Sequence, residues 1–326
     1  MPQSNNIKSK FSLFSTSRGN SELALIVSLL VVITIFSFMS EYFLTVRNLT
    51  NVLGQASIIM ALAMGVAIVL ISGEVDISVG SVVAAVAIPL VEIMNATDSL
   101  MLGIAGALAL GLMIGAINGY LSAYLRINSL IVTLGTLFII RGFVYLYTGK
   151  RPIADTGYLE NFFQLGSGRF LDILPNPALV AGIIVIFFIF IMRHTRFGRR
   201  IYAVGSNAEV ASLAGYNVRR LRFYCFIICS LLASVGGILL SSRLGSAIHT
   251  AGMGYEFQAI AAVVLGGVSL AGGIGSLFGV MLGVLILAFV SNGLGMINLP
   301  TEWQLVITGL VIIAAVALDA FKKKSR

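Results

Sequence analysis

Long apolar runs alternate with short polar breaks along almost the whole chain. A helix that crosses a membrane needs about 20 consecutive, mostly apolar residues. By this criterion the pattern predicts ten spans, at residues 22–40, 53–72, 77–94, 99–125, 128–147, 177–193, 222–243, 255–268, 274–297 and 303–321. Three of them, 77–94, 177–193 and 255–268, are short or interrupted by glycine, so we expect some spans to be broken.

The composition excludes a soluble protein. Hydrophobic residues make up 58% of the chain and charged residues only 10%, whereas a soluble domain carries about 25% charged residues. The 35 glycines suit helices that approach one another closely in lipid. The predicted fold class is therefore an all-α polytopic membrane protein.

The formal net charge of +8 lies mainly in loops and tails. Because cytoplasmic loops are enriched in Lys and Arg, we place the N-terminal tail, the turn at Arg126, the segment 193–222 and the basic tail 322–326 inside. Both termini are then cytoplasmic, which requires an even number of spans. No basic groove alternates with aromatic residues, so the charge does not indicate nucleic-acid binding.

The predicted organisation is a cytoplasmic tail at 1–21, one transmembrane domain at 22–321 and a short basic tail at 322–326. The first apolar run follows a polar tail as in a signal peptide, but it lacks a cleavage site, so we interpret it as an uncleaved helix. The domain carries a cytoplasmic loop at 194–221 and an external loop at 148–176. Glycines and prolines give the external loop turn chemistry, and both a folded cap and a solvated linker fit it.

The cytoplasmic loop contains the longest polar stretch of the chain. The segment 193–222, which includes this loop, holds seven arginines and a single acid, Glu209. Its middle, from Ser206 to Gly215, predicts a short helix that Ser206 or Asn207 caps and Gly215 ends. An ordered helix on a basic membrane face suits contact with a partner.

The second and third spans are joined by a polar break that contains Gly73, Glu74, Asp76 and Ser78. Acids close to membrane depth are costly and indicate a functional site. Asp76 and Ser78 also suit the N-terminus of the next helix, where an acid is favoured. We favour this capping role at the inner face over a substrate site.

A related passage recurs at 264–277. Laid over 69–82 without a gap, both passages begin Val-Leu and both place Gly-Ser at the same offset. Both join an inward-running span to an outward-running one. The match is sparse, and we interpret it as a candidate relic of an internal repeat.

Weakly polar side chains on the fifth span, Asn128, Ser129, Thr133 and Thr136, are the candidate pore lining. They suit a neutral, polyhydroxylated solute, although ordinary hydrogen bonds between helices explain them equally well. Few charges lie in mid-span, which argues against proton or sodium coupling. No nucleotide motif, catalytic set or metal-ligand spacing is present, so the energy source is expected on another chain, and this chain is not expected to be an enzyme.

Four passages resemble the permease subunits of bacterial ABC importers for monosaccharides, the ribose permease family, and the resemblance runs from Tyr42 to the C-terminus. These passages are EYFLTVRNL at 41–49, SGEVDISVGS at 72–81, the segment 196–215 and GYEFQAIAAVVLGG at 254–267. Glu74 departs from the family, which usually has Gly-Ile or Gly-Gly-Ile before the position of Asp76.

The resemblance implies a pore of two permease copies in the inner membrane. Its other partners would be two copies of a cytoplasmic ABC ATPase, or one tandem ATPase chain, and an extracytoplasmic sugar-binding protein. ATP and magnesium would be bound by the ATPase and no cofactor by this chain. In the family a cytoplasmic loop helix docks on the ATPase, and this role maps onto Gly205, Asn207, Glu209, Ala211 and Gly215.

The sequence thus favours an ATP-driven importer of a ribose-like pentose or a hexose. Two alternatives remain open. One is the same class of importer with a nucleoside or a furanone-type signalling substrate, and the other is a sugar channel that needs no ATPase.

Overall fold

The computed structural model describes residues 5–154, 157, 160–300, 302–304, 306, 307, 309, 310 and 313. Within this part, eight helices are long and apolar enough to cross a membrane. They are formed by α1 (Asn5–Met39), α2 (Val46–Ile71), α3 (Val79–Thr97), α4 (Leu100–Gly119), α5 (Ser129–Thr148), α7 (Asn176–His194), α10 (Val218–Leu244) and α12 (Leu277–Met296). Shorter helices are α6 (Glu160–Ser167), α8 (Arg196–Ser206), α9 (Ala208–Leu213), α11 (Tyr255–Leu265) and the π-helical turn η1 (Tyr120–Tyr124). The all-α polytopic prediction is confirmed.

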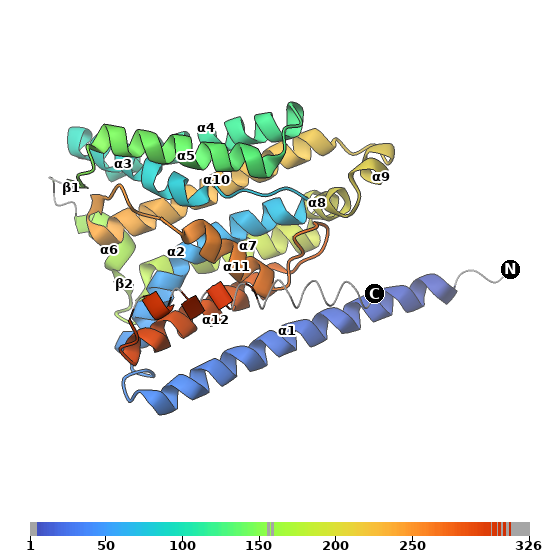
Figure 1. Ribbon diagram of the computed structural model, residues 1–326, viewed down its shortest axis with the longest axis horizontal. Coiled ribbons are helices and arrows are strands. Elements are labelled where there is room, and N and C mark those ends of the chain that lie inside the picture. The colour runs from blue at the N-terminus through green and yellow to red at the C-terminus, as the bar shows by residue number, and fades with distance from the viewer. Residues whose placement is uncertain are drawn as a thin grey trace.

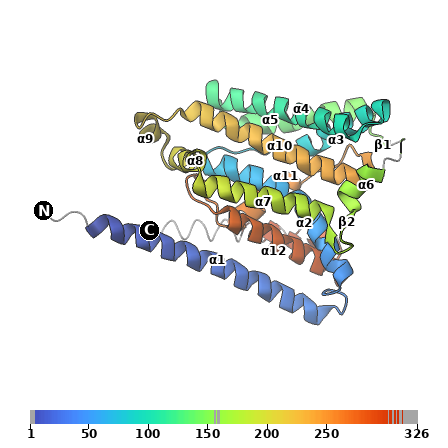
Figure 2. The same ribbon diagram turned by 180° about the vertical axis from the view of Figure 1, so that it is seen from behind.

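The long helices run roughly along one direction, so the bundle has two ends (Figures 1 and 2). One end carries α8, α9 and the described start of α1, and we call it the α9 end. The other carries α6 and two small antiparallel ladders, and we call it the α6 end. Here β1 (Ile153–Ala154) pairs with β4 (Ser246–Ala247), and β2 (Arg169–Phe170) pairs with β3 (Leu174–Pro175).

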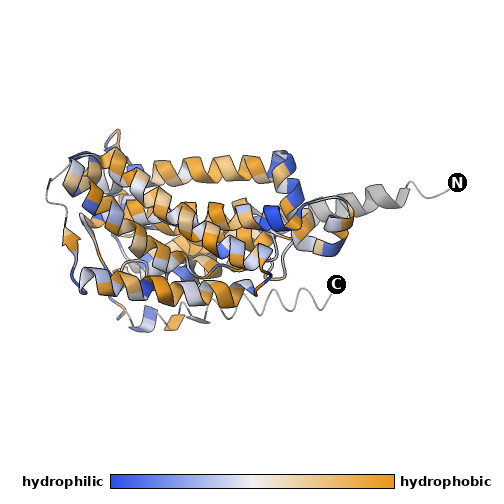
Figure 3. Cartoon of the chain, turned by 90° about the horizontal axis from the view of Figure 1, so that it is seen from above, coloured by the Kyte–Doolittle hydropathy of each residue, from blue (hydrophilic) through white to orange (hydrophobic). Residues whose placement is uncertain are grey.

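Helix α2 lies at the centre of the bundle and packs against α7, α10, α11 and α12. Every residue from Ala61 to Ile71 is buried. Close approach depends on small residues, since a Cβ at Gly65 would lie 2.8 Å from the Cα of Cys229 on α10. By contrast, α5 and α7 expose Phe138, Phe143 and Phe187, and the hydropathy colouring shows helices that are largely apolar along their length (Figure 3). These outer faces suit contact with lipid.

The chain around the segment predicted to cross at 255–268 runs between the two ends of the bundle, but only part of it is helical. Helix α11 has 11 residues, about 16 Å at 1.5 Å per residue, which is shorter than a hydrocarbon core of about 30 Å. Non-helical chain on both sides completes the passage, from β4 at the α6 end to Gly273, whose N–H donates to the Ile71 carbonyl at the α9 end (2.9 Å). Parts of this backbone, such as Gly252 and Val268, are buried by protein, where non-helical chain is tolerated.

The described part of the predicted external loop packs against the bundle, as the cap alternative expects and the linker alternative does not. Phe162 of α6 is fully buried, and its carbonyl accepts a hydrogen bond from the Ser242 hydroxyl on α10. The β1–β4 ladder fastens the same loop to the segment that follows α10.

The two turns that the sequence analysis aligns as a repeat follow α2 and α11, and both helices end in the same way. Gly73 and Gly267 both have φ +85°, and their N–H groups donate over 2.9 Å to Leu70 and Val264, respectively. The gapless register is nevertheless wrong by one residue, because it sets Gly73 against Val268. The second turn is also longer, since α3 begins at Val79 and α12 begins at Leu277.

The predicted spans agree with the observed helices within a few residues for most elements. The predicted tail at 1–21 is helical from Asn5 onwards as part of α1. The predicted span at 303–321 and the basic tail at 322–326 lie largely or wholly outside the described residues.

Candidate functional site

Three chain segments meet at the α9 end of the bundle. They are the turn between α2 and α3, the end of α8, and the turn between α11 and α12. A Cβ at Gly272 would lie 2.8 Å from the Cα of Gly73 and 2.9 Å from the carbonyl oxygen of Gly205. The Tyr202 hydroxyl on α8 also donates to the Gly275 carbonyl over 3.0 Å. We call this contact the glycine junction, and it joins the cytoplasmic-loop helices of the prediction to both turns.

An ion pair adds to the glycine junction. The guanidinium of Arg222, near the start of α10, lies 2.6 Å from the Glu74 carboxylate. The two side chains are only 24% and 12% exposed, respectively, so solvent screens the pair less than a surface pair. Glu74, the residue that departs from the family pattern, therefore ties the α2–α3 turn to the segment that leaves the cytoplasmic loop.

Asp76 and Ser78 are buried, but neither caps α3 in the predicted way. The Asp76 carboxylate accepts from the Ser78 N–H (2.9 Å) and the Ser78 hydroxyl (2.6 Å), and α3 has no side-chain capping bond. Asn118 of α4 donates to the Ser78 hydroxyl (3.0 Å). The Ser78 hydroxyl thus links the turn and Asp76 to α4.

Three of the four candidate pore residues hold the same turn, directly or through Asn118, and the fourth caps the start of α5. The Ser129 and Thr133 hydroxyls accept from the N–H groups of Val75 (3.1 Å) and Ile77 (3.3 Å). Thr136 donates to Asn118 (2.7 Å), and Asn128 caps α5 through the Leu130 N–H (3.0 Å). Ser129 and Thr133 are buried, so in this conformation they bond between segments, and their pore-lining role stays a prediction.

Helices α8 and α9 form an arm that projects from the α9 end (Figure 1). The predicted cap is confirmed, since the Asn207 side chain accepts from the N–H groups of Glu209 and Val210, both over 3.0 Å. The predicted stop is also confirmed, because Gly215 has φ +84° and directly follows Ala214, the C-cap residue of α9.

The predicted docking residues do not all face outward. Ala211 is buried with Val204 and Leu221, and Gly205 lies in the glycine junction. Outward-facing apolar side chains on α9 are Val210 and Leu213, which are 60% and 89% exposed, respectively. The sequence prediction overlooked this pair, although their spacing of three residues places both on one helix face.

Arg141 is a second residue that the sequence prediction overlooked. It lies within α5, where its guanidinium donates to the carbonyls of His249 (3.0 Å), Ala251 (2.9 Å) and Gly80 (3.1 Å). The first two bonds satisfy backbone groups of the non-helical passage before α11, and the third reaches the start of α3. The prediction that few charges lie in mid-span therefore did not take Arg141 into account. The sequence signal for this residue is a single Arg inside an apolar run.

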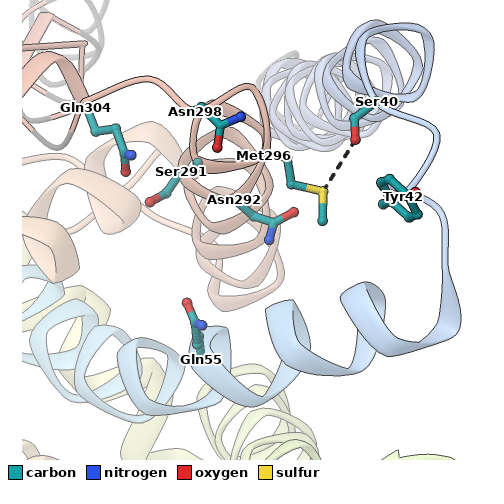
Figure 4. A pocket seen from close by; sticks show the side chains of 9 residues that line it. Ser40, Tyr42, Gln55, Ser291, Asn292, Met296, Asn298 and Gln304 are labelled. Atoms are coloured by element: carbon teal, nitrogen blue, oxygen red, sulfur yellow. Dashed lines mark hydrogen bonds between the residues drawn. The ribbon is translucent and has the colours of Figure 1, made fainter.

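A hollow opens at the α6 end beside α2 and α12 (Figure 4). Its volume is about 460 Å³, and it is lined by Ser40, Tyr42, Gln55, Ser291, Asn292, Gly295, Met296, Asn298 and Gln304. Since amide side chains dominate its polar lining, we call it the amide cleft. The sequence prediction named none of these residues, because they come from four separate segments.

Comparison with known proteins decides the family. A family model described as a branched-chain amino acid transport system permease component matches residues 48–316. The ribose import permease protein RbsC of Escherichia coli K12 is 40% identical over 91% of this chain and 93% of its own. The chain belongs to the sugar permeases of ABC importers.

Other relatives of the permease name other sugars. The L-arabinose ABC transporter permease AraH of Azospirillum brasilense is 37% identical over 93% of this chain and 88% of its own. The galactose/methyl galactoside import permease MglC of Salmonella typhimurium is 38% identical over 91% of this chain and 93% of its own. With its apolar helices, the permease is a multi-pass protein of the bacterial inner membrane.

Proposed function

We propose that the permease moves a monosaccharide into the cytoplasm, driven by ATP hydrolysis on a separate subunit that docks on the arm formed by α8 and α9. An extracytoplasmic binding protein delivers the sugar at the α6 end, and a second copy of this chain completes the pore. The observation that carries the proposal is the ordered arm with its exposed Val210 and Leu213. No ATP motif is present in the sequence, so the energy source lies in the partner.

The choice of a sugar rests on the relatives. The family description refers to branched-chain amino acids, whereas the relatives at 34–40% identity are named for ribose, arabinose and galactose. Similarity over nearly the full length of named sugar permeases indicates the cargo more specifically than the family description does. The cargo is therefore a pentose or hexose rather than an amino acid, and a nucleoside or furanone is the alternative within the same class.

The arm transmits the motion of the ATPase through the glycine junction. Closure of the ATPase pair pushes α9, and α8 passes the displacement to the two turns by the close backbone contacts at Gly73, Gly205 and Gly272. Both turns lie at the ends of crossing segments, so their displacement changes access to the pore from one side to the other. This transmission requires rigid contact between the three segments. Because these glycines have no side chains, their backbones can lie in direct contact.

The test is ATP-driven uptake in proteoliposomes that contain the permease, its ATPase and its binding protein. Leu213→Glu places a charge where an apolar contact is proposed, and burying an unpaired charge is costly. We expect uptake to fall at least about tenfold, because a loss of about 1.4 kcal/mol in docking free energy lowers the affinity for the ATPase tenfold. Leu213→Met is the matched control and keeps uptake near that of the unmodified protein.

Two outcomes would contradict the proposal. Normal uptake by Leu213→Glu, or by the double variant Glu209→Lys with Gly215→Pro, would reject docking at the arm. Equilibration of sugar by the permease alone, without ATP or partners, would favour the channel alternative.

A further inference from the structure

The polar groups of the amide cleft are all uncharged among the described residues that line it. They comprise the amides of Gln55, Asn292, Asn298 and Gln304 and the hydroxyls of Ser40, Ser291 and Tyr42. An amide offers donors and acceptors together, which matches a solute whose hydroxyl groups both donate and accept. A charged solute would find no opposite charge in this lining.

Several of these groups lack a protein partner. The side chains of Gln55, Ser291 and Asn298 make no hydrogen bond within the described part of the chain. All three side chains are exposed. Their donors and acceptors are therefore free to bond to a solute that enters the cleft.

One wall of the cleft is fixed by a reciprocal amide pair. Asn48 and Asn292 each donate to the side-chain oxygen of the other over 2.9 Å, and Asn48 also donates to the Phe43 carbonyl over 2.8 Å. These two hydrogen bonds hold α12 against α2. The lining is therefore preorganised, which lowers the cost of ordering it around a solute.

The volume of the amide cleft and the aromatic side chain at its rim also suit a small sugar ring. A volume of about 460 Å³ lies within the usual range of about 300–1,000 Å³ for small-molecule pockets. The Tyr42 side chain lies at the rim and is 70% exposed (Figure 4). Its aromatic face can cover the C–H face of a sugar ring while the amides bind the hydroxyls.

We infer that the amide cleft is a binding site for a neutral, polyhydroxylated solute, used as a station at the α6 end before the solute enters the pore. The inference rests on the proposed function, which places this end outside and makes the cargo a monosaccharide. It differs from the predicted pore lining on α5, whose hydroxyls are engaged within the protein.

The test uses thiol labelling in right-side-out vesicles that contain the whole importer. The background is low because the native thiols, Cys225 and Cys229, are free and buried. A membrane-impermeant maleimide should label Gln55→Cys, and D-ribose, L-arabinose or D-galactose should slow the labelling. At a sugar concentration twice its dissociation constant, the free fraction and hence the rate fall about threefold.

Two variants of the same helix are matched controls. Val46 is 64% exposed and lies outside the cleft, so Val46→Cys should label without protection by sugar. Ser57 is 3% exposed, so Ser57→Cys should not label. A choline chloride solution of the same osmolarity as the sugar solution controls for osmotic effects on Gln55→Cys.

The outcomes separate this inference from the proposed function. If Gln55→Cys labels equally with and without all three sugars, or does not label at all, the station is rejected. The importer function is judged independently by ATP-driven uptake of the unmodified protein. In a second measurement, Gln55→Leu should lower uptake, and uptake by that variant equal to that of the unmodified protein would also overturn the station.

Discussion

At the scale of single residues, the ion pair between Glu74 and Arg222 is the salt bridge present within the described residues. It links the α2–α3 turn to the end of the cytoplasmic loop, and the Arg222 Nε has no hydrogen-bond partner in the described part of the chain. The guanidinium therefore depends on Glu74 for its charge compensation. This gives the departure from the family pattern at Glu74 a physical meaning.

We predict that charge reversal at either residue lowers ATP-driven uptake and that the double swap restores much of it. Glu74→Arg sets two cations together, Arg222→Glu sets two anions together, and the double variant rebuilds an opposite pair. The interaction is expected to be worth about 1–2 kcal/mol, between an exposed and a buried pair. Melting temperature and uptake of the four proteins form a double-mutant cycle, and additive effects of the two single changes would refute the pair.

The hydrogen-bond partners of Arg141 can be identified only from the tertiary structure. Its position inside an apolar run marks it as unusual, but nothing local indicates its partners. These are carbonyls of residues 61, 108 and 110 positions away along the chain. The guanidinium can satisfy all three because it carries five N–H donors in a planar fork.

At the scale of elements, most spans follow from hydropathy because a membrane requires each crossing to satisfy its own backbone. The predicted span 177–193 is observed as α7 at Asn176–His194. The segment around α11 differs, since bonds from Arg141 replace helical bonds in part of its passage. The pattern of apolar residues reports burial, and it does not report whether a buried crossing is helical throughout.

The glycine junction yields a prediction for Gly205. A Cβ there would overlap the Ile71 carbonyl oxygen and lie 2.6 Å from the Gly273 nitrogen. Gly205→Ala should therefore cost about 1–3 kcal/mol, as overpacking usually does, and lower the melting temperature and uptake. Gly182→Ala on α7 is the control, since a Cβ there meets nothing within 4 Å. Equal melting temperatures of the two variants would disprove the close contact.

At the scale of the whole molecule, the two ends of the bundle should face opposite compartments. The arm carries exposed Arg199, and exposed Arg219 and Arg220 follow at the start of α10, as expected for a cytoplasmic face. The α6 end is covered by the folded cap. The orientation follows from charge, and the structure places the Arg-rich segment 193–222 at the α9 end.

We predict that an impermeant maleimide labels Lys150→Cys only from outside intact cells and Ser212→Cys only after the inner face is opened. Both positions are exposed, and the buried native thiols contribute little background. Unmodified protein measures that background in both preparations. Labelling of Ser212→Cys in intact cells would invert the assigned orientation, and with it the docking side of the ATPase.

The sequence by itself determined the class of fold, nearly all of the crossings and the cap and stop of α9. These are local properties of hydropathy, charge and turn chemistry, so each can be found within about 20 residues of chain. Only the tertiary structure decided the partner of Glu74, the carbonyls bound by Arg141, the direction in which each arm residue faces and the lining of the amide cleft. These depend on contacts between distant segments, which the packing of helices creates and no local pattern encodes.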